Sequence, residues 1–345
     1  MTAFTVTINT VLVNPTLAPL LDAIRAATGR EDIDWARQPE PLTGGFWAEM
    51  WRVRITGSPE LAGDLVARVM PVADVARRET RVQRRLAEDG FPTPMVRLSA
   101  GPGPHLDRAW MLMEHASGQT LLADLSGPGA LLRLPQLVRS LPDTLADCAA
   151  ALHGIPPDVV DPELAPCDDT ERILARLHGD AAARDDRDLV TLAESLTGSR
   201  PAARRLAICH GDLHPFNILA RPGAHTVLDW SSTQIADPTY DLAFTHLLLA
   251  QPPLAAPAPL RPIIDTAGRG IARRFLKSYE RRTGHPVDTA RLRWFTRLQS
   301  LRILGEVASW SHDDTIDTHR DHPFLALAPA LRRIMTADAG SRSPA

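Results

Sequence analysis

The sequence contains almost no lysine and very little cysteine. Lys277 is the only lysine among 345 residues, so any basic side chain needed elsewhere has to be arginine or histidine. The three cysteines, Cys148, Cys167 and Cys209, are odd in number, far apart and outside any CxxC pattern. This spacing argues against a disulfide framework and against a zinc site. Cys209 lies in an apolar stretch and is expected to be a small core residue.

Long uninterrupted apolar runs are also absent. The longest apolar stretch, residues 247–260, is broken by four prolines and is too short to cross a bilayer. The N-terminus lacks a basic segment followed by an apolar core, so we expect no secretion signal and a cytoplasmic location. A net charge of −3 argues against a general nucleic-acid binder, which would be clearly basic. We therefore expect no membrane partner and no nucleic-acid partner.

Length and composition predict a two-lobed globular protein. A chain of 345 residues exceeds the usual size of one hydrophobic core. Hydrophobic residues make up 44% of the chain and charged residues 23%, which is ordinary for a soluble domain.

The most informative segment is residues 208–220, which reads as an apolar strand, a polar loop and a second apolar strand. Inside the loop, Asp212 precedes Asn217 by five positions, which is the spacing of a kinase catalytic loop. Twelve residues after Asn217, a third apolar strand ends in Asp229. Two carboxylates and one amide at strand ends suit oxygen coordination of Mg²⁺ on a nucleotide.

The motifs of this region resemble those of the aminoglycoside phosphotransferase family. They are HGDLHPFN at residues 210–217, LDW at 228–230 and DPTYDLA at 237–243. The resemblance covers about residues 40–310 and implies kinase-like phosphorylation of small molecules, with ATP or GTP and Mg²⁺. It implies Asp212 as the catalytic base, and Asn217 and Asp229 as metal ligands.

The resemblance also implies a fold class, α+β, in the two-lobed form of protein kinases. We expect an N-terminal nucleotide-binding lobe at residues 1–113, with an antiparallel sheet and one helix, and a hinge at 114–118. A larger, mainly helical lobe follows at 119–336, and residues 337–345 form a frayed tail. From apolar periodicity and proline and glycine stops, helices are expected at 74–89, 131–153, 170–177, 188–196, 240–250, 263–282, 289–310 and 322–335. Pro135 and Pro142 should shorten or kink the second of these.

Kinases ordinarily pair the α- and β-phosphates with a lysine on the third strand, and this chain has none there. Residues 64–70 read as that strand, and Arg68 takes the place of the lysine with a fork of phosphate-binding donors. We expect Glu79, in the following helix, to pair with Arg68. The alternatives are an exposed strand arginine and a solvated helix glutamate.

Other nucleotide contacts follow from the resemblance. Gly44 and Gly45 would bring backbone amides close to phosphate oxygens, although a Gly-Gly pair also suits a plain hairpin turn. Backbone groups of Glu114 to Ala116 would pair with the base edge. Met113 would line the base pocket, or simply fill the core.

The polar loop contains two histidines, and the motif region ends in a further aspartate. His210 should pack beneath the loop as scaffolding, whereas His214 could approach the phosphates. Asp241 should cap the helix that follows it, and in the family this aspartate resembles a brace under the catalytic loop.

The acceptor is expected to be a small-molecule hydroxyl. Only eleven residues separate Asp229 from Asp241, which leaves no activation segment for docking a peptide. Aminoglycosides, macrolides, amino alcohols and sugars stay open. The acidic segment 312–322 could bind a polyamine sugar, although a solvated loop is the commoner role. Trp230, Trp294 and Trp310 could instead stack on an apolar acceptor.

Two other function classes remain open on the sequence alone. A pseudokinase or nucleotide-binding regulatory module would explain the missing lysine, but it would not need Asp212. A kinase-fold nucleotidyl transferase would move the α-phosphate rather than the γ-phosphate.

Overall fold

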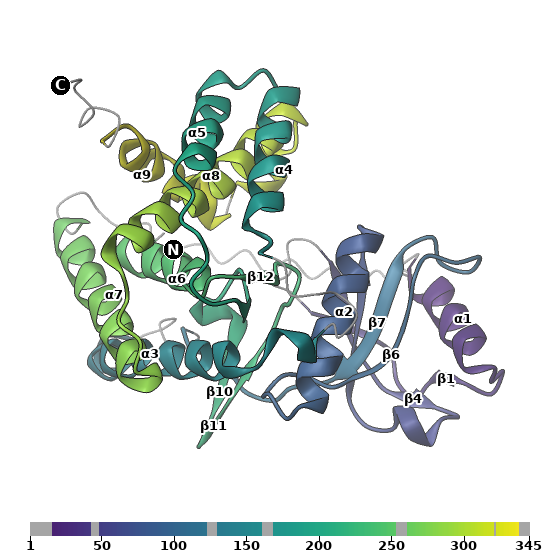
Figure 1. Ribbon diagram of the computed structural model, residues 1–345. Coiled ribbons are helices and arrows are strands. Elements are labelled where there is room, and N and C mark those ends of the chain that lie inside the picture. Colours follow the sequence, from purple (N-terminus) through teal and green to yellow (C-terminus); the bar gives the residue numbers. More distant parts are fainter. Residues whose placement is uncertain are drawn as a thin grey trace, which may run out of the picture. The chain divides into compact units, whose positions relative to one another are not determined.

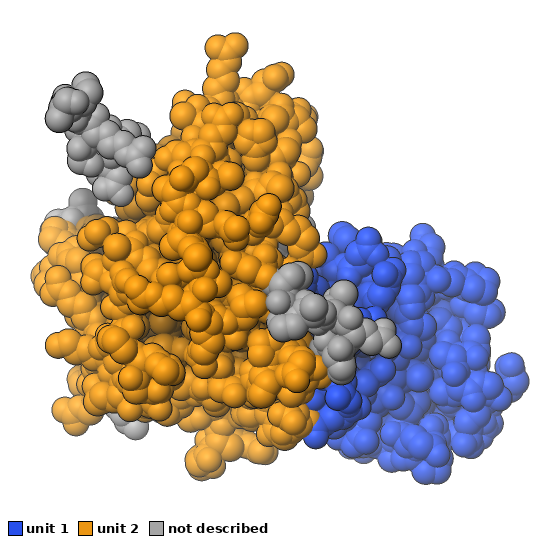
Figure 2. All heavy atoms as spheres, viewed as in Figure 1, with its two compact units in different colours: residues 1–88, 94–116 blue, residues 89–93, 117–345 orange. Residues whose placement is uncertain are grey.

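The structure, a computed structural model, describes residues 16–42, 48–122, 130–160, 168–252, 261–320 and 322–337 (Figure 1). It divides into two compact units, residues 1–88 with 94–116 and residues 89–93 with 117–345 (Figure 2). The first unit is built on an antiparallel sheet and the second is mainly helical, which confirms the predicted α+β class.

The first unit contains a five-stranded sheet in which every pair of neighbours is antiparallel. In spatial order its strands are β2 (Glu40–Pro41), β3 (Glu49–Val53), β5 (Leu65–Met70), β7 (Ala109–Glu114) and β6 (Val96–Ala100). The first unit also contains a two-stranded ribbon, β1 (Asp34–Trp35) with β4 (Ile55–Thr56), and the short 3₁₀-helix η1 (Pro59–Leu61).

The period-two alternation of the central strand β5 decides what covers each face of the sheet. Leu65, Ala67 and Val69 pack in one core cluster with residues of α1 (Leu17–Thr28). Val66 and Met70 belong to a second cluster that includes α2 (Ala73–Glu88). Arg68 shares their parity and therefore faces α2. The sequence analysis predicted α2 but not α1, whose end is marked by Gly29 in the left-handed conformation.

The second unit is a set of helices around a few short strands (Figure 1). Its α-helices are α3 (Ala130–Gly154), α4 (Thr170–Ala183), α5 (Arg187–Gly198), α6 (Thr239–Ala250), α7 (Arg261–Thr283), α8 (Thr289–His312) and α9 (Pro323–Ala337). Single turns of 3₁₀-helix lie at η3 (Pro157–Val159), η4 (Pro215–Asn217) and η6 (Ile316–His319). The strands are β8 (Gln119–Thr120), β9 (Ala207–Cys209), β10 (Ile218–Arg221), β11 (Ala224–Val227) and β12 (Gln234–Ala236).

Helix α6 forms the centre of this unit. Ten of its twelve residues are buried, and it packs against both α7 and α8. Helix α3 also packs against α7, and α9 packs against α8. A helix that is apolar on all sides has to be enclosed by others, so the sequence of α6 fixes the arrangement of its neighbours.

Residues 89–93, which follow α2, pack with the second unit. The Val227 amide donates to the Pro92 carbonyl at 2.8 Å, and the Trp230 indole donates to Thr93 Oγ1 at 2.8 Å. The Phe91 ring meets Trp230 edge-on at 5.6 Å. The sequence analysis did not anticipate these contacts, because nothing local in the sequence marks them.

The predicted helices of both units are present, with different limits. Helix α4 runs six residues further than predicted, to Ala183, and α3 continues through Pro135 and Pro142. The alternative that these prolines shorten the helix is therefore wrong, and a kink stays a prediction. No helix in the described ranges is long and apolar enough to span a membrane. Of the predicted tail, only Ala337 is described, and it ends α9.

Candidate active site

The predicted catalytic loop lies between two short antiparallel pairs of strands. Strand β9, which leads into the loop, pairs with β12, and β10, which leaves it, pairs with β11. In the β10–β11 ladder Ile218 is opposite Val227, and the Leu228 amide donates to the Asn217 carbonyl at 2.8 Å. Asn217 and Asp229 are therefore held at neighbouring strand ends, as their spacing predicted.

Asp212 and Asn217 are in direct contact. The Asn217 side-chain amide donates to the Asp212 carbonyl oxygen at 3.0 Å and to Asp212 Oδ2 at 3.2 Å. Because the Nδ2 group is used in this way, the Asn217 Oδ1 atom is the one left to coordinate a cation. The proposed base and one proposed metal ligand are therefore hydrogen-bonded to each other.

Asp229 has a backbone conformation that side chains with a Cβ rarely adopt. Its φ is +64°, and its Oδ1 accepts from the Ser231 hydroxyl at 2.7 Å and from the Ser231 amide at 3.3 Å. Strained backbone of this kind persists where the surrounding structure enforces it, commonly at functional sites. Together with Asn217, Asp229 offers only oxygen donors, which is the donor set that Mg²⁺ prefers.

Asp241 holds the start of the catalytic loop from below. Its carboxylate, fully buried, accepts from the backbone amides of His210 and Gly211 at 2.7 Å each. Gly211 has a φ of +79°, and a Cβ there would lie 2.0 Å from the Ser232 carbonyl oxygen. The family-based expectation of a brace is confirmed by these bonds.

The expectation that Asp241 caps its helix is wrong. Helix α6 has Pro238 at its N-cap and no side-chain cap, and the Asp241 oxygens are occupied by the loop amides. Asp237 binds the start of the helix instead, since its Oδ1 accepts from the Thr239 amide at 3.0 Å and from the Thr239 hydroxyl at 2.6 Å.

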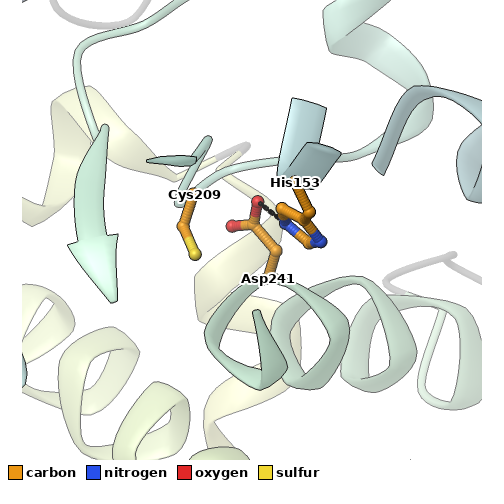
Figure 3. A group of neighbouring side chains, drawn as sticks. All are labelled: His153, Cys209 and Asp241. Atoms are coloured by element: carbon orange, nitrogen blue, oxygen red, sulfur yellow. Dashed lines mark hydrogen bonds and ion pairs between the residues drawn. The ribbon is translucent and has the colours of Figure 1, made fainter. Parts of the chain in front are cut away.

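His153 and Cys209 lie beside Asp241, and in the described ranges these three are the one group of at least three His, Cys, Asp or Glu side chains whose possible ligand atoms lie within 4.8 Å of one another (Figure 3). His153 Nε2 is 3.1 Å from Asp241 Oδ2, and His153 Nδ1 is 2.9 Å from the Tyr279 hydroxyl. A carboxylate can only accept here, so Nε2 donates to Asp241. Burial raises the pKa of the Cys209 thiol well above its usual value. These contacts describe a hydrogen-bonded brace rather than a metal centre.

The two histidines of the loop have different roles. His210 is fully buried, donates from Nε2 to the Leu228 carbonyl at 2.9 Å and packs on Trp230 at 4.7 Å, which confirms it as scaffolding. Burial lowers the pKa of His210, so its ring is neutral. His214 Nε2 lies 3.4 Å from Asp212 Oδ2. The sequence analysis had directed His214 toward phosphates, whereas its described partner is the proposed base.

The electrostatics favour the ionised form of Asp212. Burial by itself would raise the pKa of this carboxyl. The charge and hydrogen bond of His214, with the charge of Arg302, outweigh burial and hold the pKa of Asp212 far below its usual value. Burial also disfavours the charged form of His214, but Asp212 more than compensates and the pKa of His214 is raised.

In the first unit, Arg68 and Glu79 form the predicted ion pair. Arg68 Nη2 lies 3.3 Å from Glu79 Oε1, and the two side chains are 7% and 1% exposed. A buried pair of this kind needs both partners, because either charge alone would be left uncompensated. Its role toward a nucleotide stays a prediction.

The predicted hinge is largely hydrogen-bonded within the first unit. The Glu114 amide donates to the Met95 carbonyl at 2.9 Å, and the His115 amide donates to the Asp64 carbonyl at 3.0 Å. Met113 is buried in the core cluster on the α2 side of the sheet, with its sulfur 3.3 Å from Gln83 Nε2. Of the three hinge residues, only Ala116 has an amide without a bond to the described chain.

Two further predictions concern the glycine turn and the tryptophans. Gly44 and Gly45 lie outside the described residues. Trp230, Trp294 and Trp310 are all buried, and Trp310 is covered by His319, whose ring stacks on it at 4.3 Å. These rings are therefore core residues and are not free to stack on an acceptor.

Arg302 on α8 is the site residue that sequence reasoning missed. Its guanidinium lies over the Phe244 ring at 4.7 Å, and its charge acts on Asp212. Nothing in the local sequence of α8 distinguishes Arg302 from the helix's other arginines, since the contact arises from how α8 packs on α6.

The comparisons with known proteins agree with this geometry. The family model described as "Phosphotransferase enzyme family" matches residues 39–295. Aminoglycoside 3'-phosphotransferase of Streptomyces fradiae is 27% identical over 297 residues, which cover 77% of this chain and 94% of that protein.

Two solved structures share the fold. Macrolide 2'-phosphotransferase MphH of Brachybacterium faecium has a TM-score of 0.54 at 19% identity, covering 91% of this chain and 99% of that one. The GDP complex of an aminoglycoside 2'-phosphotransferase-IIIa variant has a TM-score of 0.58 at 18% identity, covering 94% and 100%. At these identities the likeness concerns the fold, and it confirms the predicted kinase-like class.

Proposed function

Since the chain belongs to the phosphotransferase enzyme family, and so to the kinase-type enzymes that phosphorylate hydroxyl groups, we propose that it moves the γ-phosphoryl group of a nucleoside triphosphate to a hydroxyl of a small-molecule acceptor. The observation that carries the proposal is the contact of Asp212 with Asn217, beside the strained Asp229. A binding module would have no use for an ionised carboxylate held next to a metal-binding amide.

In the proposed reaction, Asp212 orients the acceptor hydroxyl and receives its proton. The new bond joins the acceptor oxygen to the γ-phosphorus, and the bond from that phosphorus to the β,γ-bridging oxygen breaks. Asn217 and Asp229 would hold Mg²⁺, which would screen the phosphate charge when bound. The low pKa of Asp212 makes it a weak base, so its main contribution is to position the hydroxyl in a loose transition state.

The first unit would contribute the remaining nucleotide contacts. Arg68, kept in place by Glu79, would contact the α- and β-phosphates. The Ala116 amide, which has no partner in the part of the chain that the structure describes, would be the hinge donor to the base, because those of Glu114 and His115 are already used. The GDP bound to a relative of the same fold supports a purine nucleotide, and ATP and GTP are both to be tested. Gly44 and Gly45 would approach the phosphates through their backbone amides.

The test is transfer of label by the pure protein with Mg²⁺. ATP and GTP labelled at the α- or the γ-phosphate are offered with aminoglycosides, macrolides, amino alcohols and sugars. The variant Asp212→Asn is compared with the wild-type protein in the same assay. Asp313→Asn is the matched control, because Asp313 is exposed and distant from the loop in sequence. We expect γ-label in a product that depends on one acceptor class, and a loss of at least about 10²-fold in kcat in Asp212→Asn only.

Two results would contradict the proposal. Transfer of α-label would identify a nucleotidyl transferase. Nucleotide binding without transfer to any acceptor would identify a regulatory module.

A further inference from the structure

Arg302 lies near the proposed catalytic base and has no ion-pair partner among the residues that the structure describes. The Arg302 guanidinium lies 4.7 Å above the Phe244 ring, and Phe244 lies 6.5 Å from the His214 ring. His214 in turn is 3.4 Å from Asp212. These contacts place a permanent cation on the α8 side of the site, behind the residue that touches the base.

The donors of Arg302 are unused within the described chain. Its Nε is buried without a hydrogen-bond partner, and no ion pair joins its guanidinium to a described carboxylate. Glu306, one helical turn further along α8, forms no ion pair with Arg302 in the described structure. A half-buried guanidinium that contacts only an aromatic face still has its fork of donors available for an oxyanion.

The charges of the surrounding side chains point the same way. Burial, with the nearby charge of Asp212, raises the pKa of Glu306 even though Arg302 opposes this. Burial lowers the pKa of His322 to about 4, so His322 is neutral at neutral pH. The pKa of His214 is raised. Among the described side chains near Asp212, Arg302 therefore supplies a permanent positive charge for an entering acceptor.

We infer that the acceptor carries an oxyanion group, a carboxylate, sulfate or phosphate, which Arg302 binds while the acceptor hydroxyl meets Asp212. This inference rests on the proposed function and narrows its acceptor classes. A polycationic acceptor would be repelled by Arg302, whose charge cannot be removed by deprotonation. In the described part of the acidic segment 312–322, Asp313 and Asp314 are exposed and Asp317 is paired with Arg320.

The experiment uses hexoses that differ only at carbon 6. Glucose, glucuronate, glucose 6-sulfate, glucose 6-phosphate and 6-amino-6-deoxyglucose are compared by kcat/KM, with the same five charge types built on glycerol as a second series. Arg302→Met and Arg302→Lys are measured with Arg293→Met, which removes an exposed charge from the same helix. The three oxyanions separate carboxylate, sulfate and phosphate recognition.

We expect the wild-type protein to prefer one oxyanion over its neutral parent by about 10- to 100-fold, the range of a charge-assisted hydrogen bond. Arg302→Met should abolish that preference through KM, so that the loss of kcat/KM is about 10- to 100-fold larger for the preferred oxyanion than for the neutral parent. Arg302→Lys should restore part of the preference. If thermal melting shows that Arg302→Met is unfolded, Arg302→Lys replaces it as the test variant. Arg293→Met should behave as wild type.

Other outcomes would overturn the inference. A preference for the neutral or amino compound, or turnover of a polycationic acceptor alone, would show that Arg302 does not select an anion. An equal loss for all acceptors in Arg302→Met would make Arg302 a counter-ion of Asp212 only. If the wild-type protein turns over no acceptor of any charge, both the proposed function and this inference are wrong. If turnover is lost only in Asp212→Asn, the proposed function is supported.

Discussion

Replacing Asp241 by asparagine should uncouple the catalytic loop from its support. The wild-type carboxylate accepts from two backbone amides at 2.7 Å and from His153 Nε2 at 3.1 Å, all without contact with water. An asparagine has one acceptor oxygen, so its NH₂ group must face either a loop amide or the His153 donor. One charge-assisted bond is lost and one buried donor is left unpaired.

The cost follows from these contacts. A hydrogen bond to a charged group contributes about 1.5–3 kcal/mol, and an unsatisfied buried donor costs about 1–3 kcal/mol. Since the asparagine retains part of the network, we expect Asp241→Asn to lower the free energy of unfolding by about 2–4 kcal/mol. A loop displaced by about 1 Å should also lower kcat by about 10²-fold.

Urea unfolding followed by tryptophan fluorescence gives the first quantity, and acceptor-dependent turnover below the unfolding transition gives the second. Asp313→Asn is the control for removing an exposed carboxylate. The reasoning is refuted if Asp241→Asn unfolds within about 0.5 kcal/mol of wild type and keeps its kcat, because the brace would then contribute nothing.

Three further predictions concern the groups around the loop and the buried ion pair. Asn217→Ala should raise the Mg²⁺ concentration for half-maximal activity at least about 10-fold, and an unchanged Mg²⁺ titration would remove Asn217 from the metal site. Arg68→Met should lower the free energy of unfolding by about 3–5 kcal/mol, because Glu79 is left as a buried unpaired charge. In thermal melting, the double variant Arg68→Met with Glu79→Leu should recover much of this loss. No recovery would contradict a coupled pair. The pKa of His214 is raised by Asp212, so its contribution to stability is full below pH 6.5 and is lost as the pH rises through the raised value. Wild type should therefore lose stability relative to His214→Gln as the pH rises from 6 to 9, and parallel pH profiles would show that the pair is not coupled.

Local signals in the sequence were enough to predict the catalytic segment. Two apolar runs around a polar loop become β9 and β10, and the five-residue spacing brings Asn217 into contact with Asp212. The Arg68–Glu79 pair was predictable because strand parity and helix periodicity each place one partner. In these cases short-range geometry decides the long-range contact.

Features that depend on packing between distant helices could not be predicted in this way. Pro135 and Pro142 are residues that commonly shorten or kink a helix, yet α3 continues through both and packs along α7. Asp241 occupies the first turn of α6, where a helix cap is the expected role, and only the fold shows the loop amides above it. Arg302 has no local pattern at all, because its place beside Phe244 comes from the packing of α8 on α6.

The hydrogen-bond chain beneath the loop also bears on how this protein is made. His153 is at the end of α3, Asp241 is in α6 and Tyr279 is in α7, so His153 contacts residues 88 and 126 positions further along the chain. During synthesis, Asp212, Asn217 and Asp229 leave the ribosome well before Tyr279 does. The loop is fully braced only when α7 has emerged and packed, so a partly synthesised chain carries every proposed catalytic side chain without the complete support that orders them.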